Sequence, residues 1–330
     1  MKRIFSIVVA LVATITVGAQ NIAVVSPSNT TKIYQTLDEA ITNAEKGSII
    51  YIPGGGFTVT DNAKIDKKLT IMGVSHRGDT DNVDGATIIS GNLNFIKGSS
   101  HSAVIGVYVS GNINVATSTD SVANFTMRHC NVNSVQVKNS KSSGMVINQC
   151  YLRNYSDFYS CNVSLTNCIM HSAKNVNGGK VDHCIITSYT GWYDDGWYPA
   201  LQNFNSTTIT NNFFTGSRSL YSTHSGSNCF VSNNCRGTTA WGENPVVLDE
   251  GTKWEDVFKT PKGVSIASEY KLIGKWGKSA ALDGSDLGIY GGSNFDDKAL
   301  APIPRIVSKK VAESTDGSGK LEVTVTVKAQ

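Results

Sequence analysis

The phrase MRHCNV (127–132) recurs along the chain as INQCYL (147–152), LTNCIM (165–170), VDHCII (181–186), ITNNFF (209–214) and VSNNCR (231–236). An apolar residue opens each copy, a His, Gln or Asn stands two places later, and Cys or Asn comes next. A degenerate repeat at intervals of 16–28 residues is typical of one short supersecondary unit that is stacked on itself.

Two apolar columns run through these copies. The first column is Met127, Ile147, Leu165, Val181, Ile209 and Val231. The second is Val132, Leu152, Met170, Ile186 and Phe214, with Arg236 as its exception. One coil cannot bury its inner face, whereas stacked coils share a continuous core. The repeat therefore predicts an all-β solenoid whose parallel strands hydrogen-bond from coil to coil at a spacing of about 4.8 Å.

A polar column lies between the two apolar ones. Its members are His129, Gln149, Asn167, His183, Asn211 and Asn233. We expect these residues at a bend, where their side chains bond to turn backbone and to one another along the stack.

A short helix and several strands are predicted before the repeat. In TLDEAITNAEKG (36–47), Thr36 and Glu39 have the spacing of a capping box and Gly47 follows as a stop, so we expect a helix that covers the N-terminal end of the stack. The predicted strands are SIIYI (48–52), FTVT (57–60), LTIMG (69–73), ATIIS (86–90) and VIGVYV (104–109).

The helix followed by GSIIYIPGGGFTV (47–59) and KKLTIMGVS (67–75) resembles the opening of right-handed parallel β-helix proteins of the pectate lyase-like superfamily. The resemblance covers roughly residues 33–295. It implies a single-stranded right-handed parallel β-helix but no particular activity, because this fold carries lyases, hydrolases, esterases, epimerases and non-catalytic adhesins.

The first 19 residues have the features of a secretory signal peptide. Lys2 and Arg3 precede the apolar stretch Ile4–Ala13, and Val17–Ala19 is a small-residue cleavage signature. The predicted location is therefore secreted or periplasmic. No later stretch approaches about 18 apolar residues, so no transmembrane segment is predicted.

The region after the repeat is irregular. It contains WGENPVV (241–247), a helical or looped KWEDVFK (253–259), SDLGIYGGSNF (285–295) and the alternating LEVTVTVKAQ (321–330). The DLGIYGG segment and the last strand resemble the ends of secreted β-helix proteins of gut-type bacteria. We therefore expect a β-helix over 20–300 with an irregular C-terminal cap, and a C-terminal extension or cap strand over 301–330.

Charged residues make up 17% of the chain and the net charge is +3, without long charged blocks, so binding to nucleic acid is not expected. Asn, Ser, Thr and Gly are abundant, and a surface rich in hydroxyls and amides suits sugars. A polysaccharide or cell-surface glycan is the expected partner, and the oligomeric state is left open.

The chain has seven cysteines. Cys130, Cys150, Cys168 and Cys184 hold the same place in successive repeats, where stacked side chains run parallel, so buried thiols are favoured over disulfides. A disulfide between Cys229 and Cys235 stays open as an alternative. No spacing of Cys and His indicates a metal site.

The longest interval in the repeat contains TGWYDDGWYP (190–199). Its candidate glycan-binding residues are Trp192, Tyr193, Asp194, Asp195, Trp197 and Tyr198. Aromatic faces stack on sugar rings, although the same loop can instead pack as a lid on the stack. The Asp pair resembles that of the polygalacturonase-like branch, but the Gly-His-Gly and Arg-Ile-Lys partners of that branch are missing, so that activity is not expected.

VDHC (181–184) resembles an Asp-His pair of pectate lyases. A lyase needs a base and a cation that stabilises the enolate-like charge. Weak catalytic candidates in outward columns, expected on one face, are Arg128, Arg153, His171, Lys180 and Asp182.

The sequence favours a secreted, non-catalytic β-helix that binds glycans or surface partners. The alternative is a lyase-like enzyme for uronate glycans, and no cofactor is expected except calcium in that lyase-like case.

Overall fold

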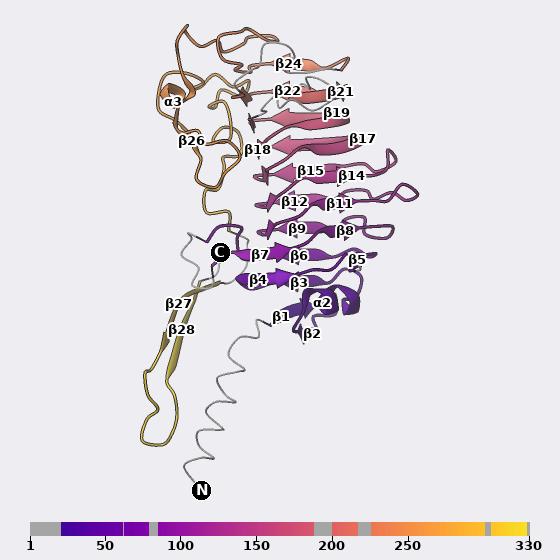
Figure 1. The fold of residues 1–330 in the computed structure, drawn as a ribbon, viewed down its shortest axis with the longest axis vertical. Helices are drawn as coiled ribbons and strands as arrows, with labels where there is room; N and C mark the ends of the chain where they lie inside the picture. The colour runs from indigo at the N-terminus through magenta and orange to yellow at the C-terminus, as the bar shows by residue number, and fades with distance from the viewer. Residues whose placement is uncertain are drawn as a thin grey trace.

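The computed structural model describes residues 21–61, 63–78, 85–187, 200–216, 226–300 and 305–328. These residues are mostly β, with long sheets of parallel strands and two small antiparallel sheets. Figure 1 shows the parallel strands stacked along the long axis of the molecule. Within these ranges, no helix has the length and hydropathy that crossing a membrane requires.

The parallel strands form three rows, in which each strand pairs with its counterparts in neighbouring repeats. The first row is β3 (Ile49–Tyr51), β6 (Thr70–Met72), β9 (Ala103–Ile105), β12 (Thr126–Arg128), β15 (Met145–Asn148), β22 (Thr208–Thr210) and β24 (Phe230–Ser232). The second row is β4 (Gly55–Thr58), β7 (Thr87–Ser90), β10 (Tyr108–Val109), β13 (Asn131–Val132), β16 (Tyr151–Leu152), β18 (Ile169–Met170), β20 (Ile185–Ile186) and β23 (Phe213–Phe214). The third row is β5 (Lys64–Ile65), β8 (Leu93–Phe95), β11 (Ile113–Val115), β14 (Val135–Val137) and β21 (Leu201–Asn205). The long strands β17 (Ser156–Thr166) and β19 (Ala173–Asp182) contribute to both the first and the third row.

The register of these rows is the one that the repeat predicts. In the first row, Met127 pairs with Ile147, which pairs in turn with Leu165, and the column continues to Val231. In the second row, Val132 begins the equivalent column, which continues to Phe214. Except for the half-buried Val231, these side chains are buried in one continuous core. Both predicted columns are therefore confirmed.

The polar residues stand at the bend between the first and second rows, as expected. We call them the turn column: His129, Gln149, Asn167, His183, Asn211 and Asn233. All six adopt left-handed backbone, with φ between 49° and 62°. Gly106 occupies the same bend one repeat earlier with φ 65°. The run 104–109, predicted as one strand, is therefore two, β9 and β10.

The N-terminal end carries the predicted helix in a shorter form. Helix α2 covers Leu37–Asn43, and the Thr36 hydroxyl accepts a hydrogen bond from the Glu39 amide at 3.2 Å. The chain becomes extended at Ala44, so the last predicted residues are not helical. Strand β1 (Ile22–Val25) pairs antiparallel with β3, and β2 (Thr31–Tyr34) pairs with β1 as the outermost strand of the sheet.

The region after the repeat covers the end of the stack that carries β24, where residues 243 and 246 form parallel bridges with the last copy of the phrase, and it also extends over one side of the stack. It includes α3 (Trp254–Val257), which is shorter than the predicted segment 253–259, and the pair β25 (Phe258–Thr260) and β26 (Glu269–Leu272). Its apolar residues pack on the outward side chains of the second row and form a second core with them. Members from the second row are Tyr151, Ile169, Ile185 and Phe213, and members from the covering region include Val257, Phe258, Leu287, Ile289 and Phe295.

The turn column holds residues 277–300, which we call the C-terminal strap. His129 Nδ1 lies 3.0 Å from the Leu300 carbonyl oxygen, and Gln149 Nε2 donates to the Asn294 carbonyl at 2.9 Å. The Asn233 amide at the other end of the column donates to the Ala280 carbonyl at 3.0 Å. The strap therefore runs back along the stack, as the orange and yellow trace beside the strands shows in Figure 1.

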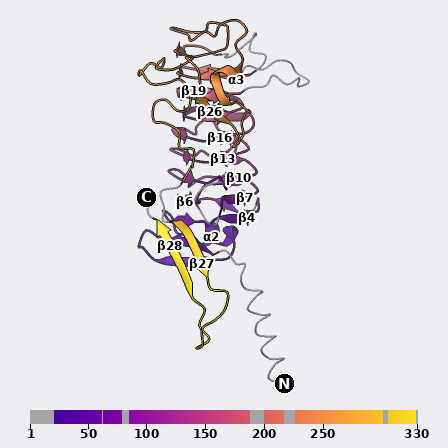
Figure 2. The ribbon, with the colours of Figure 1, turned by 90° about the vertical axis from the view of Figure 1, so that its left-hand side faces the viewer.

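The last described residues form an antiparallel hairpin of β27 (Arg305–Val311) and β28 (Val323–Lys328). The strand predicted within 321–330 is present, but its partner is β27 and not the stack. Figure 2 shows the hairpin extending past the end of the stack that carries α2.

Candidate functional site

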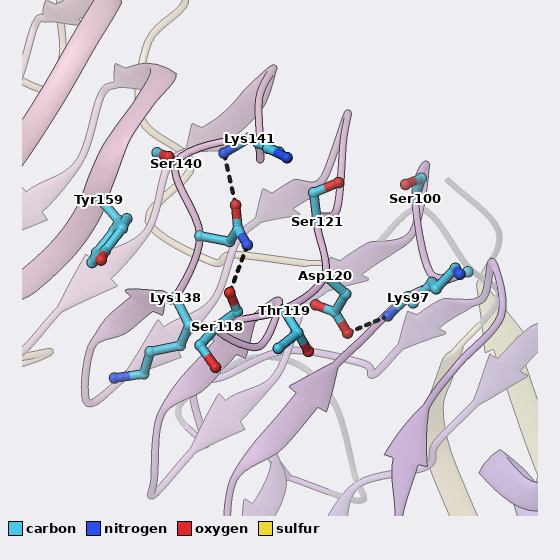
Figure 3. Close-up of a pocket in the computed structure, with 12 residues that line it drawn as sticks. Lys97, Ser100, Ser118, Thr119, Asp120, Ser121, Lys138, Ser140, Lys141 and Tyr159 are labelled. Atoms are coloured by element: carbon cyan, nitrogen blue, oxygen red, sulfur yellow. Dashed lines mark hydrogen bonds between the residues drawn. The ribbon is translucent and has the colours of Figure 1, made fainter.

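A groove of about 770 Å³ crosses the turns that connect the third row to the first. Lys97 follows β8, Asp120 follows β11, Lys138 and Lys141 follow β14, and Tyr159 lies between the two parts of β17. Serine and threonine side chains of the same turns complete the lining (Figure 3). We call this feature the lysine groove.

Hydrogen bonds between successive turns fix the groove floor. The Asp120 carboxylate accepts from the backbone amides of Lys97, at 3.0 Å, and Thr117. One repeat further, Asn139 Nδ2 donates to the Ser118 carbonyl oxygen at 3.0 Å. These bonds use the acidic and amide side chains, and they hold the backbone from which the lysine side chains project.

The lysine groove carries more positive than negative charge. Lys97, Lys138 and Lys141 are exposed, and the structure records no ion pair for their ammonium groups with any residue that it describes. The single lining carboxylate, that of Asp120, already accepts two backbone hydrogen bonds. Because neighbouring strands of a sheet lie about 4.8 Å apart, the turns from Lys97 to Tyr159 extend over roughly 14 Å along the stack. This length and charge suit an extended ligand with several anionic groups.

The outer face of the third row, next to the groove, is a column of polar side chains. In order along the stack they are Asn94, Asn114, Gln136, Asp157, Lys174 and Gln202. Asn114 Nδ2 donates to Asn94 Oδ1 at 2.8 Å. A second hollow of about 260 Å³ lies at this end of the column and is lined partly by both asparagines and by Lys64.

A charged cluster stands further along this column. Lys174 Nζ lies 3.2 Å from Asp157 Oδ2 and 4.9 Å from the centre of the Tyr155 ring. Burial lowers the pKa of Lys174, but the hydrogen bond and charge of Asp157 outweigh it, and the pKa is raised overall. The Tyr159 amide donates to Asp157 Oδ1 at 3.0 Å, so the cluster adjoins the end of the lysine groove.

Three of the predicted catalytic candidates lie on the outer face of the first row. Arg128 is exposed there, in the same column as Asp182 but three strands away, which corresponds to roughly 14 Å. Lys180 Nζ is 3.4 Å from Asp182 Oδ2. Asp182 Oδ1 accepts hydrogen bonds from Thr210 and Asn211, at 3.0 and 2.8 Å.

Asp182 is strongly acidic in this environment. Burial raises its pKa, but hydrogen bonds from His183, Asn211 and Thr210 and the charge of His183 outweigh burial and lower the pKa to about 2. A carboxylate this acidic is a poor proton acceptor at neutral pH. Asp182 therefore acts as an anchor for the neighbouring turn.

The other two candidates lie at the opposite edge of the second row. The Arg153 guanidinium donates to Asn131 Oδ1 at 2.8 Å and to the carbonyls of Val109 and Ser110, and it lies 4.4 Å from the centre of the Tyr108 ring. Burial lowers the pKa of His171, whose Nδ1 is 2.8 Å from the Ser172 hydroxyl. The five candidates thus form two separate groups, and the expected single face is not found.

The aromatic candidates Trp192, Tyr193, Asp194, Asp195, Trp197 and Tyr198 lie outside the described residues. The signal peptide 1–19 does as well. Among the residues that the structure does describe, no group of three or more His, Cys, Asp or Glu side chains is arranged to hold a metal ion.

All seven cysteines are free thiols. The four repeat cysteines form the predicted ladder, in which the Cys150 sulfur accepts a hydrogen bond from the Cys130 amide at 3.4 Å. Cys229 and Cys235 are also unbridged, so the alternative of a disulfide between them is not realised.

The lysine groove was not among the residues singled out from the sequence. Its turns read KGSSH (97–101), TSTDS (117–121) and KNSKSS (138–143), with a spacing of about 20 residues. Their common feature is a set of hydroxyl side chains at a repeated position, with lysines in the first and third turns, and a search for apolar columns passes over it. No protein-family model matches this chain, and none of the curated proteins compared with it is significantly similar.

Proposed function

We propose that the chain is a right-handed parallel β-helix protein of the pectate lyase-like superfamily, in which one coil contains one strand of each row. The in-register pairing of each row supports this reading, as does the left-handed turn column. The right-handed path rests on the general handedness of connections between parallel strands.

We further propose that the protein is a non-catalytic scaffold that binds an acidic glycan chain in the lysine groove. The observation that carries this proposal is the set of three exposed ammonium groups in the groove. Lys97 lies on one turn, and Lys138 and Lys141 lie two turns further along, with Asp120 on the turn between them. Carboxylates or sulfates along the glycan would pair with these groups, and ring hydroxyls would bond to the serines and threonines between them. Tyr159, whose side chain is 50% exposed, offers an aromatic face at one end.

The geometry favours this scaffold over a lyase acting on uronates. The Arg153 guanidinium is engaged by three acceptors, and Lys180 is close to the carboxylate of Asp182. A lyase would need these groups free and gathered at one reacting carbon. Absorbance of an unsaturated product, measured with uronate polysaccharides in the presence and absence of calcium, would reveal a lyase directly.

Secretion is part of the proposal and rests on the N-terminal sequence. Sequencing the N-terminus of protein exported by the native host tests it, with Gln20 as the expected first residue. A protein that retains Lys2 and Arg3 would contradict it.

Titration calorimetry with polygalacturonate, alginate and a sulfated glycosaminoglycan tests the groove. We expect the Lys138→Ala/Lys141→Ala variant to bind about tenfold more weakly than the wild type, because two surface ion pairs are lost. Binding should also weaken as salt is added.

The matched control is Lys262→Ala/Lys271→Ala, which removes two exposed lysines outside the groove. Equal losses in both variants would indicate attraction by net charge and would overturn the proposed site. The variant Trp192→Ala/Trp197→Ala measures separately whether the aromatic residues of 190–199 contribute, as the sequence predicts.

A further inference from the structure

The C-terminal hairpin projects away from the stack of parallel strands. The side chains described between Ser308 and Thr326 are exposed, apart from a half-buried Ala312. Strands β27 and β28 pair only with each other, so each has one open edge. A two-stranded hairpin without a packing partner is at best marginally stable in water. We therefore expect the hairpin to pack against a surface that lies outside the described part of this chain.

One face of the hairpin is mostly apolar. Val311 pairs with Val323 across the strands, and Val325 lies on the same face because it is two residues further along β28. These three valines are 44%, 51% and 45% exposed, and Leu321 nearby is 48% exposed. The hairpin is also basic, because residues 305–328 contain five Lys or Arg and three Asp or Glu.

The opposite end of the stack has the complementary character. Phe230 in β24 is 44% exposed and Val247 is 38% exposed. Residues 241–257 contain five carboxylates and one lysine. All five carboxylate residues, among them Glu250 and Glu255, are exposed. We call this surface, residues 230 and 241–257, the distal end.

The two surfaces cannot meet within one molecule. Figure 1 places β24 and the hairpin at opposite ends of the long axis, with the whole stack between them. We propose that the hairpin of one molecule docks on the distal end of a second copy of this chain. Valines then cover Phe230 and Val247, and basic residues of the hairpin face the carboxylates.

Such a contact is heterologous, because the two surfaces differ. A heterologous contact that is repeated without closing a ring produces an open chain of molecules. The expected product is therefore a head-to-tail assembly in which the lysine grooves of successive molecules follow one another, which would offer a long glycan several binding sites. The docking itself is independent of the proposed glycan binding.

Sedimentation velocity of the full mature protein over a wide range of concentration tests the assembly. We expect the weight-average mass of the wild type to rise with concentration, and the Val323→Asp/Val325→Asp variant to remain a monomer. A monomeric wild type at every concentration, or assembly that survives in the variant, would overturn the proposal. A fixed twofold dimer at all concentrations would contradict the head-to-tail arrangement.

Charge reversal tests the pairing without altering the valines. Lys309 pairs with Val325 and therefore belongs to the docking face of the hairpin. Lys309→Glu/Lys320→Glu on the hairpin and Glu250→Lys/Glu255→Lys on the distal end should each weaken association about tenfold. A mixture of the two variants should regain it, because the reversed surfaces are again complementary. The control Arg128→Glu changes an exposed charge in the middle of the stack and should associate as the wild type does. Failure of the mixture to associate better than either variant alone would exclude this contact.

Discussion

His129 Nδ1 lies 3.0 Å from the carbonyl oxygen of Leu300, which is 171 residues further along the chain. The same imidazole contacts Gln149 Oε1 in the next coil through Nε2, at 3.1 Å. A residue of the turn column thus bonds both along the stack and outward to the strap. Because the strap has little regular secondary structure of its own, these side chains supply partners for its backbone groups.

Asn167 makes the largest number of these contacts, and its loss should loosen the strap. Its Nδ2 donates to the carbonyls of Ile289 and Gly291, both at 2.8 Å, and its Oδ1 accepts from Ser293 at 2.7 Å. Asn167→Gly keeps the left-handed backbone and removes only the side chain. We expect the free energy of unfolding to fall by about 2 kcal/mol, measured by urea titration.

Asn124→Gly is the matched control, because Asn124 also has left-handed backbone, with φ 56°, and is exposed. It should change the stability by less than about 0.5 kcal/mol. Hydrogen exchange should quicken at 289–293 in the Asn167 variant alone. Similar exchange in both variants would mean that the strap is held by its apolar contacts.

The apolar contact between the stack and the region that covers its side depends on Phe213. Its ring lies 4.8 Å from that of Phe258 and 6.3 Å from that of Trp254, centre to centre. Gly288 packs so closely that an added Cβ would stand 3.0 Å from the Phe213 ring. Phe213→Ala should therefore lower the free energy of unfolding by about 3–5 kcal/mol.

Phe230→Ala provides the comparison for Phe213, since Phe230 is 44% exposed. Its effect on a urea titration should remain below about 1 kcal/mol. If the two variants lost similar stability, the second core would contribute little, and the region that covers the side of the stack would be only loosely attached.

The stack could be predicted from the sequence because each inner column repeats an apolar residue at one position of the phrase. The strap could not, because its contacts join residues such as His183 and Ser285, which no local pattern relates. One signal was present in the second row, where Ile169 and Ile185 stand beside inward apolar residues. A strand that is apolar on both faces is covered on both faces.

The lysine groove could not be predicted from the sequence, for a different physical reason. Its residues are exposed and belong to turns, so they take no part in the periodic burial that reveals a strand. A second feature could not be recognised for another reason. The segment VIGVYV (104–109) has Gly106 at the bend, where the other copies of the phrase have His, Gln or Asn, so it does not look like a copy of the phrase. Only the backbone conformation identifies that position as a turn.

Buried thiols should be unreactive in the folded protein. Burial raises the pKa of Cys150 and of Cys184 well above the ordinary value, and raises that of Cys161 and Cys235 to about 12. The thiolate is the reactive form, and Cys229 is the one partly exposed cysteine among the seven. A chromogenic thiol reagent at mildly alkaline pH should therefore label one equivalent rapidly.

Two comparisons decide the thiol prediction. Cys229→Ala should abolish the rapid phase, and unfolding in guanidinium should expose the remaining thiols. Rapid labelling of several cysteines in the native wild type would contradict the buried ladder.

The ionised Asp182 carboxylate should make the free energy of unfolding depend on pH in the acidic range. Its folded pKa of about 2 lies below the ordinary value of 3.8, so its contribution is complete above pH 4 and disappears as pH falls through 2. The shift corresponds to about 2 kcal/mol at neutral pH. Asp182→Asn should therefore be less stable than the wild type by about this amount at pH 6, and the difference should shrink toward pH 2.

The exposed Asp66, changed to Asn, should alter stability by less than about 0.5 kcal/mol at either pH. A constant difference for Asp182→Asn across this range, in urea titrations at each pH, would show that lost packing and not lost charge causes the effect.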